Sequence, residues 1–221
     1  MKRVLPAAVA ALSLTLAGAA TAAEPTFPDW RQYRDVANSS YVEPDGDKVL
    51  QLSIVVKATP AQVWRAFTTG EGYREWVAPV ARIDLAVDGI IEASYDANAQ
   101  IGDPDNIKNR IVAFVPERML SIRNVQAPKA LPHRDLFPRI STTIEFEDLG
   151  LGRTRVVLTA VGYGPGAGFD TLYRHFEWGN AYTLNELKKR FDTGPVDWAA
   201  VAERRKAAAA SAVVTGGGTT K

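Results

Sequence analysis

The sequence predicts an α+β domain in which one long helix near the C-terminus packs against a curved antiparallel sheet of about six or seven strands. Three observations support this prediction. An amphipathic helix is expected late in the chain, at residues 169–191. A run of strand-like segments precedes it, without the helices that parallel strands would need as crossovers. Two short helices are expected directly after the first strand.

The long helix carries an apolar stripe about 120° wide when its residues are placed at 3.6 per turn. The stripe consists of Phe169, Leu172, Tyr173, Phe176, Asn180, Thr183, Leu184, Leu187 and Phe191. Asn180 lies at its centre, where a buried amide is costly unless it finds hydrogen-bond partners. Asn180 therefore indicates a space filled by water or a ligand beside the helix. The alternative is a closed core in which this amide bonds to the backbone.

The sheet is predicted from alternating apolar residues between turn signals. The first strand is expected at 48–57, and the others at 80–87, 90–95, 107–115, 119–125, 139–148 and 153–162. Thr59 and Pro60 are a favourable N-cap and first residue for the first short helix. Residues 70–72 are expected to end that helix, and a second helical turn is expected near 73–76.

The termini are predicted to lie outside the domain, which we place at residues 48–192. Residues 1–23 have the positive start, short apolar run and small residues of a secretory signal peptide, so a periplasmic or secreted protein is expected. Residues 24–47 form an aromatic N-terminal extension that should pack on the domain. Residues 193–221 should hold a short helix over 196–210 and a disordered tail. The chain has no cysteine, which excludes disulfides and a lipid anchor on cysteine.

Composition and motifs exclude several classes of function. The net charge of +1 argues against nucleic-acid binding. No metal site is expected, because His133 and His175 are the only histidines and form no ligand-spaced pair. No cofactor is expected either. The glycine-rich segment at 162–168 matches neither the G-x-G-x-x-G pattern nor the G-x-x-x-x-G-K-[ST] pattern of phosphate-binding loops. His175 is expected at the surface.

Two segments resemble a known family. Residues 54–68 run from a strand into a helix with Thr59-Pro60, Val63-Trp64 and Ala66-Phe67, and Trp76 follows. This pattern, together with residues 175–180, resembles the START-like or SRPBCC (helix-grip) superfamily, and within it the family named after the activator of heat-shock chaperone ATPase. The resemblance covers roughly residues 48–192. It departs from the family where Trp178 precedes Gly179, the reverse of the usual order.

The resemblance implies a helix-grip fold and leaves function open, because the superfamily includes carriers, aromatase/cyclases and co-chaperones. The favoured hypothesis is an exported protein that binds or carries a small apolar or amphipathic molecule. The alternative is a cyclase or dehydratase in which Tyr95, Arg110 or His133 orients and protonates the substrate. A co-chaperone is less favoured, because an exported protein does not meet a cytosolic chaperone. The candidate ligand-binding residues are Trp76, Tyr95, Asn109, Arg110, Phe146, Tyr173, Phe176 and Asn180.

An aromatic patch is expected on the helix face opposite the stripe, where His175, Trp178 and Tyr182 come together. Exposed aromatic patches usually have a partner. The N-terminal extension is the nearest candidate, and a homodimer through the Trp178/Tyr182 face is the alternative.

Overall fold

The computed structural model describes residues 25–204 and 206–207, and it confirms the α+β class. The predicted signal peptide and most of the tail lie outside these residues. The described part contains nine strands: β1 (Ala37–Asn38), β2 (Tyr41–Val42), β3 (Lys48–Val56), β4 (Val80–Ile83), β5 (Ile90–Ser94), β6 (Ile107–Val115), β7 (Met119–Gln126), β8 (Ser141–Gly150) and β9 (Arg153–Tyr163). Its labelled helices are η1 (Trp30–Gln32), α1 (Pro60–Thr68), α2 (Gly70–Arg74), η2 (Phe137–Arg139) and α3 (Ala167–Thr193), and residues 198–204 are also helical.

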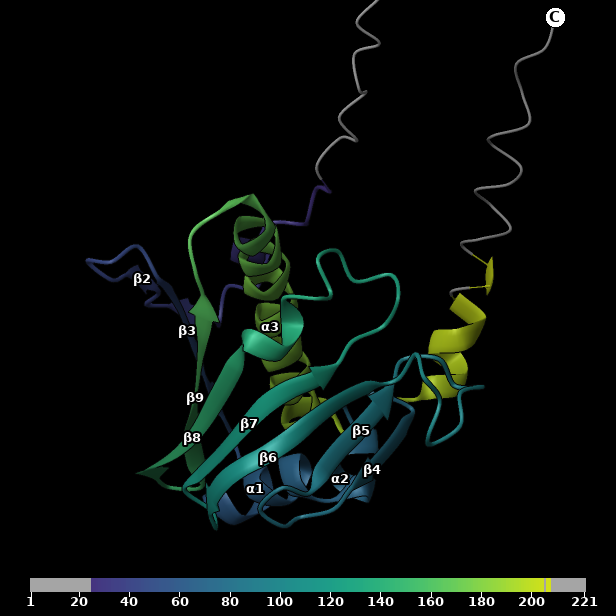
Figure 1. Ribbon diagram of the computed structural model, residues 1–221. Coiled ribbons are helices and arrows are strands. Elements are labelled where there is room, and N and C mark those ends of the chain that lie inside the picture. Colours follow the sequence, from purple (N-terminus) through teal and green to yellow (C-terminus); the bar gives the residue numbers. More distant parts are fainter. Residues whose placement is uncertain (1–24, 205, 208–221) are drawn as a thin grey trace, which may run out of the picture.

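All nine strands belong to one antiparallel sheet, in the order β1-β3-β9-β8-β7-β6-β5-β4, with β2 also paired to β3. The first long strand, β3, therefore lies beside the last, β9. The sheet curves around α3 (Figure 1). It has more strands than the predicted six or seven because the N-terminal extension adds β1 and β2 along the free edge of β3.

The two short helices follow β3 as predicted, with one difference at their junction. Thr59 caps α1 in a capping box: its hydroxyl accepts from the Gln62 backbone N–H, and the Gln62 side chain accepts from the Thr59 N–H. Gly70 begins α2 instead of separating the helices. The reason is that Thr69 ends α1 and also caps α2, by accepting from the Gly72 N–H.

The long helix α3 packs on β3 and β9 through the predicted stripe. Leu172, Leu184 and Leu187 of this stripe are fully buried. The helix ends at Thr193 and is followed by Gly194, whose φ of 105° is a conformation that glycine adopts without strain. Within the described residues, no helix has both the length and the apolar character needed to cross a membrane.

The N-terminal extension lies along the outer side of α3. Tyr33 and Tyr182 have ring centroids 6.1 Å apart, and the Asn38 side-chain amide donates to Glu177 at 2.9 Å. The expected contact between the extension and this helix face is therefore present. The homodimer through the same face stays a prediction, and Tyr182 keeps 40% of its surface exposed.

The chain beyond α3 returns to α2. Residues 198–204 are helical, close to the predicted start of the last short helix. The Trp198 indole N–H donates to the Arg74 carbonyl at 2.6 Å, and the Val196 N–H donates to the Glu75 carbonyl at 2.8 Å. These bonds fasten the C-terminal segment beside the end of the sheet formed by β4 and β5 (Figure 1).

Candidate functional site

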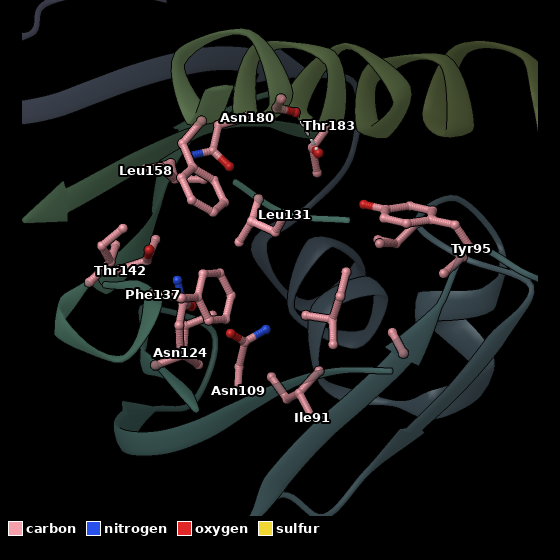
Figure 2. A pocket seen from close by; sticks show the side chains of 18 of the residues that line it. Ile91, Tyr95, Asn109, Asn124, Leu131, Phe137, Thr142, Leu158, Asn180 and Thr183 are labelled. Atoms are coloured by element: carbon pink, nitrogen blue, oxygen red, sulfur yellow. Dashed lines mark hydrogen bonds between the residues drawn. The ribbon is translucent and has the colours of Figure 1, made fainter. Parts of the chain in front are cut away.

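A cavity of about 390 Å³ lies between α3 and the sheet (Figure 2). Its size falls within the usual range for small-molecule sites, roughly 300–1,000 Å³. One wall comes from α3, and the floor comes from β5 to β9. The segment between β7 and β8 closes one side, and α1, α2 and the residues after α2 close another.

Most of the lining is apolar. The large contributors are Phe67, Trp76, Ile91, Leu120, Ile122, Leu131, Phe137, Ile140, Ile144, Leu158 and Phe176. The polar side chains among the lining residues are Ser94, Tyr73, Tyr95, Asn109, Asn124, Thr142, Tyr163, His175, Asn180 and Thr183. Lys, Arg, Asp and Glu are all missing from the lining within the described part of the chain. The cavity is thus an apolar space with scattered neutral polar groups.

The wall formed by α3 contains two polar side chains and a glycine. Asn180 and Thr183 point from the helix into the cavity (Figure 2). The Thr183 hydroxyl donates back to the Gly179 carbonyl at 2.8 Å, whereas the Asn180 carboxamide has no hydrogen-bond partner among the described residues. A Cβ added to Gly179 would meet no atom within 4 Å. This side of α3 therefore borders open space.

Two asparagines face the cavity from the floor. Asn109 of β6 and Asn124 of β7 are directly paired across the strands, and both are buried. Figure 2 shows Asn109 pointing toward α3. Its carboxamide oxygen, Oδ1, is buried and accepts no hydrogen bond from any described residue. An unpaired buried acceptor costs about 1–3 kcal/mol, so a donor that reached this oxygen would stabilise the protein.

Tyr163 presents a second unpaired group. Its side chain is fully buried at the end of β9, and its hydroxyl has no partner among the described residues. Burial, followed by the nearby Tyr173, raises the pKa of Tyr163 well above its usual range. The hydroxyl therefore keeps its proton at neutral pH.

His175 is the third cavity residue with an unpaired polar atom, and its position corrects the prediction of a surface histidine. The ring is half-buried, lies 5.1 Å from the rings of both Phe27 and Phe176, and lines the cavity. Its Nδ1 is buried without a hydrogen-bond partner in the described residues. Burial lowers the pKa of His175, which favours the neutral ring at pH 7. The helical wheel missed this position because the extension, which carries Phe27, covers a side of α3 that a bare domain would expose.

Aromatic rings border the cavity at two sides. Tyr95 reaches in from the end of β5 while keeping 44% of its surface exposed (Figure 2). On another side, Phe137 of η2 stacks on Phe176 of α3 with centroids 5.8 Å apart. The segment between β7 and β8 is thus held against the helix, and Leu131 of this segment points into the cavity (Figure 2).

Five of the eight candidate residues line this cavity: Trp76, Tyr95, Asn109, Phe176 and Asn180. The other three do not. Arg110 lies on the outer face of the sheet and pairs with Asp88 at 3.5 Å, because successive residues of β6 point to opposite faces. Since Asn109 points inward, Arg110 must point outward.

Phe146 and Tyr173 are placed in other parts of the core. Phe146 packs in an aromatic cluster with Trp64 and Phe67. Tyr173 lies edge-on against Tyr163, with ring centroids 5.4 Å apart. The apolar stripe of α3 is wide, and only part of it borders the cavity. The stripe alone therefore does not show that Phe176 and Asn180 line the cavity whereas Tyr173 does not.

The structure also changes the residues available for the enzyme hypothesis. Arg110 is outside the cavity, and His133 is an exposed residue of the segment between β7 and β8. Tyr163 and His175 lie inside it instead. Within residues 25–204 and 206–207, no three His, Asp or Glu side chains come together as a metal site.

The curved sheet, the long helix and the cavity between them define a helix-grip domain of the SRPBCC type, which is a ligand-binding fold. Residues 48–192 match the sequence model of the family described as polyketide cyclase / dehydrase and lipid transport, and the chain belongs to this family. No curated protein matches the sequence.

Solved structures share the fold at low sequence identity. A protein from Mesorhizobium loti is 19% identical with a TM-score of 0.52, and the match covers 67% of this chain and 99% of that one. A conserved protein of unknown function from Enterococcus faecalis is 15% identical with a TM-score of 0.50, covering 79% and 91%. The Aha1 dimer from Colwellia psychrerythraea is 18% identical with a TM-score of 0.47, covering 66% and 97%.

Proposed function

We propose that this protein is exported and binds or carries a small, largely apolar molecule in the cavity between α3 and the sheet. The observation that carries the proposal is the combination of an apolar cavity of about 390 Å³ with buried polar atoms that the described residues leave unpaired. Such a combination is typical of small-molecule sites. In a closed core, these atoms would be paired or replaced by apolar groups.

Gly179 supports the same proposal. Glycine in the middle of a helix destabilises it by roughly 0.5–1 kcal/mol relative to alanine. Gly179 nevertheless lies well inside the 27 residues of α3, and no neighbouring atom requires it, since an added Cβ would meet open space. A glycine here enlarges the cavity at the expense of helix stability, as expected of a wall that must leave room for a ligand.

The neutral character of the polar groups favours a binder over an enzyme. The cavity offers amides, hydroxyls and an imidazole whose pKa is lowered by burial, and no carboxylate or ammonium group lies among its described lining residues. Export rests on the sequence of residues 1–23 alone. The cyclase or dehydratase remains the second candidate, with His175 as a neutral base and Tyr163 as a proton donor, because both residues line the cavity and each has a polar atom without a partner among the described residues.

The proposal is tested with N-phenyl-1-naphthylamine, an uncharged dye whose emission rises in apolar sites. The wild type should bind it. Gly179→Phe should weaken binding at least about tenfold, because the ring would occupy the space that a ligand needs. Gly179→Ala is the matched control: it should retain binding and stabilise the fold by about 0.5–1 kcal/mol. Equal dye binding by wild type and a folded Gly179→Phe variant would contradict the proposal.

A further inference from the structure

We propose that the cavity selects uncharged ligands that carry a hydrogen-bond donor, such as a hydroxyl, and that Asn109 Oδ1 receives this donor. The inference rests on the proposed function and specifies its ligand class. Two properties of the lining support it: its described residues include no Lys, Arg, Asp or Glu, and some of their polar atoms are unpaired.

The lack of charged side chains in the described lining argues against a ligand that buries a charged group in the cavity. An ionised carboxylate, phosphate or ammonium in an apolar site is stable only when it is paired with an opposite charge or held by several hydrogen bonds. The described lining contains no Lys, Arg, Asp or Glu. The imidazole of His175 is kept neutral at pH 7 because burial lowers its pKa. A fatty-acid or phospholipid headgroup would therefore find no counter-charge inside the cavity.

Two charged residues on the strands of the floor, Glu92 and Arg110, do not fill this role, because both are paired outside the cavity. Glu92 of β5 is buried, but its carboxylate accepts from the Gly102 N–H and the Asn106 amide and lies 3.8 Å from Lys108. Arg110 pairs with Asp88 on the outer face of the sheet. The described lining itself therefore offers a ligand only neutral polar groups.

The unpaired acceptor on Asn109 favours a ligand that carries a hydrogen-bond donor. Asn109 is 9% exposed, and its Oδ1 is an acceptor without a partner among the described residues. Its position is central to the floor: Ile91 of β5 and Asn124 of β7 are its cross-strand neighbours, and all three line the cavity. A ligand hydroxyl that points at the floor would satisfy this oxygen while its apolar body contacts the remaining walls.

Tyr163 complements this arrangement from the end of β9. Its unpaired hydroxyl is both a donor and an acceptor. The cavity therefore offers polar atoms on more than one strand. A molecule with a hydroxyl at one end and apolar rings or chains elsewhere matches it better than a pure hydrocarbon.

The charge preference is tested with two dyes that share one skeleton. N-phenyl-1-naphthylamine is neutral, whereas 8-anilino-1-naphthalenesulfonate carries one negative charge. The wild type should bind the neutral dye at least about tenfold more tightly. Equal or tighter binding of the sulfonate at the same site would overturn the inference while leaving the proposed function intact. If neither dye binds, the proposed function and the inference fall together.

The donor preference is tested by competition with decan-1-ol and decyl methyl ether. Both keep an oxygen acceptor, but only the alcohol donates. The alcohol should displace the neutral dye roughly tenfold better from the wild type. Asn109→Leu should abolish this advantage and remain folded, since it removes an unpaired amide. Arg110→Leu, one residue along the same strand and on the outer face, should keep it.

Two results would overturn the role of Asn109. Equal displacement by alcohol and ether from the wild type would show that water already satisfies Oδ1, and this comparison needs no variant. Retention of the alcohol's advantage in Asn109→Leu would assign the acceptor to another atom. Thermal unfolding of each variant establishes that its fold is intact before binding is compared.

Discussion

Single residues decide whether the space beside α3 is a closed core or a binding cavity. Asn180 illustrates what the sequence reveals at this scale. Its place in the centre of an apolar stripe predicted an adjoining space, and the structure places its unpaired amide in the cavity lining. The strand residues were harder to assign. Adjacent Asn109 and Arg110 look equally suitable in the sequence, and only the register of β6 shows that the first points inward.

Asn180→Leu should retain the fold and hold or raise the melting temperature, because it replaces an unpaired amide with an apolar side chain. It should also weaken binding of N-phenyl-1-naphthylamine several-fold, since the branched chain removes a polar contact and fills space. Thermal melts and dye titration measure the two effects. A large loss of stability with unchanged dye binding would instead identify Asn180 as a structural amide.

His175 should make stability fall in mildly acidic solution. Burial lowers its pKa in the folded chain below the usual value of about 6.5, so the unfolded chain binds a proton more readily. Stability is therefore fully retained above about pH 6.5 and decreases as the pH falls toward the lower, folded-state pKa. His175→Phe should reduce the drop in melting temperature between about pH 7.5 and about pH 5. An unchanged drop in this variant would refute the assignment to His175.

Elements of secondary structure were predictable where a local signal starts or stops them. The capping pair at Thr59, the turn glycines and the alternation along the strands gave β3, α1 and β5 to β9 to within a few residues. The signals failed where one residue has two roles. Thr69 ends α1 and also caps α2. The helix α2 therefore begins at Gly70 and includes Gly72, although glycine disfavours helices. The strands β1 and β2 are only 2 residues each and exist because β3 offers a free edge.

The capping box at Thr59 should contribute measurably to stability. Thr59→Ala leaves the Gln62 N–H without its acceptor and should cost about 1 kcal/mol of unfolding free energy. Thr59→Ser keeps the hydroxyl and should recover most of this loss. Urea denaturation of the three proteins provides the comparison. A loss equal for serine and alanine would show that the hydroxyl is not the cause.

At the scale of the whole molecule, the α+β class followed from the order of the elements: a strand, a capped helix, a run of strands and a late amphipathic helix. The SRPBCC superfamily followed from the resemblance of residues 54–68 and 175–180. The cavity did not follow in the same way. Its walls come from segments as distant as residues 67 and 183, and His175 is enclosed only because the N-terminal extension folds back along α3. Contacts of this length leave no periodic trace in the sequence.

The central claim, a small neutral ligand carried by an exported protein, is tested most directly by native mass spectrometry of the protein purified from the organism that makes it. We expect a mature chain that starts at Ala23 or Glu24 and carries a bound organic molecule, released as a neutral species on activation. Gly179→Phe, purified in the same way, should lack it. A bare wild-type chain that still retains residues 1–23 would contradict both the export and the carrier role.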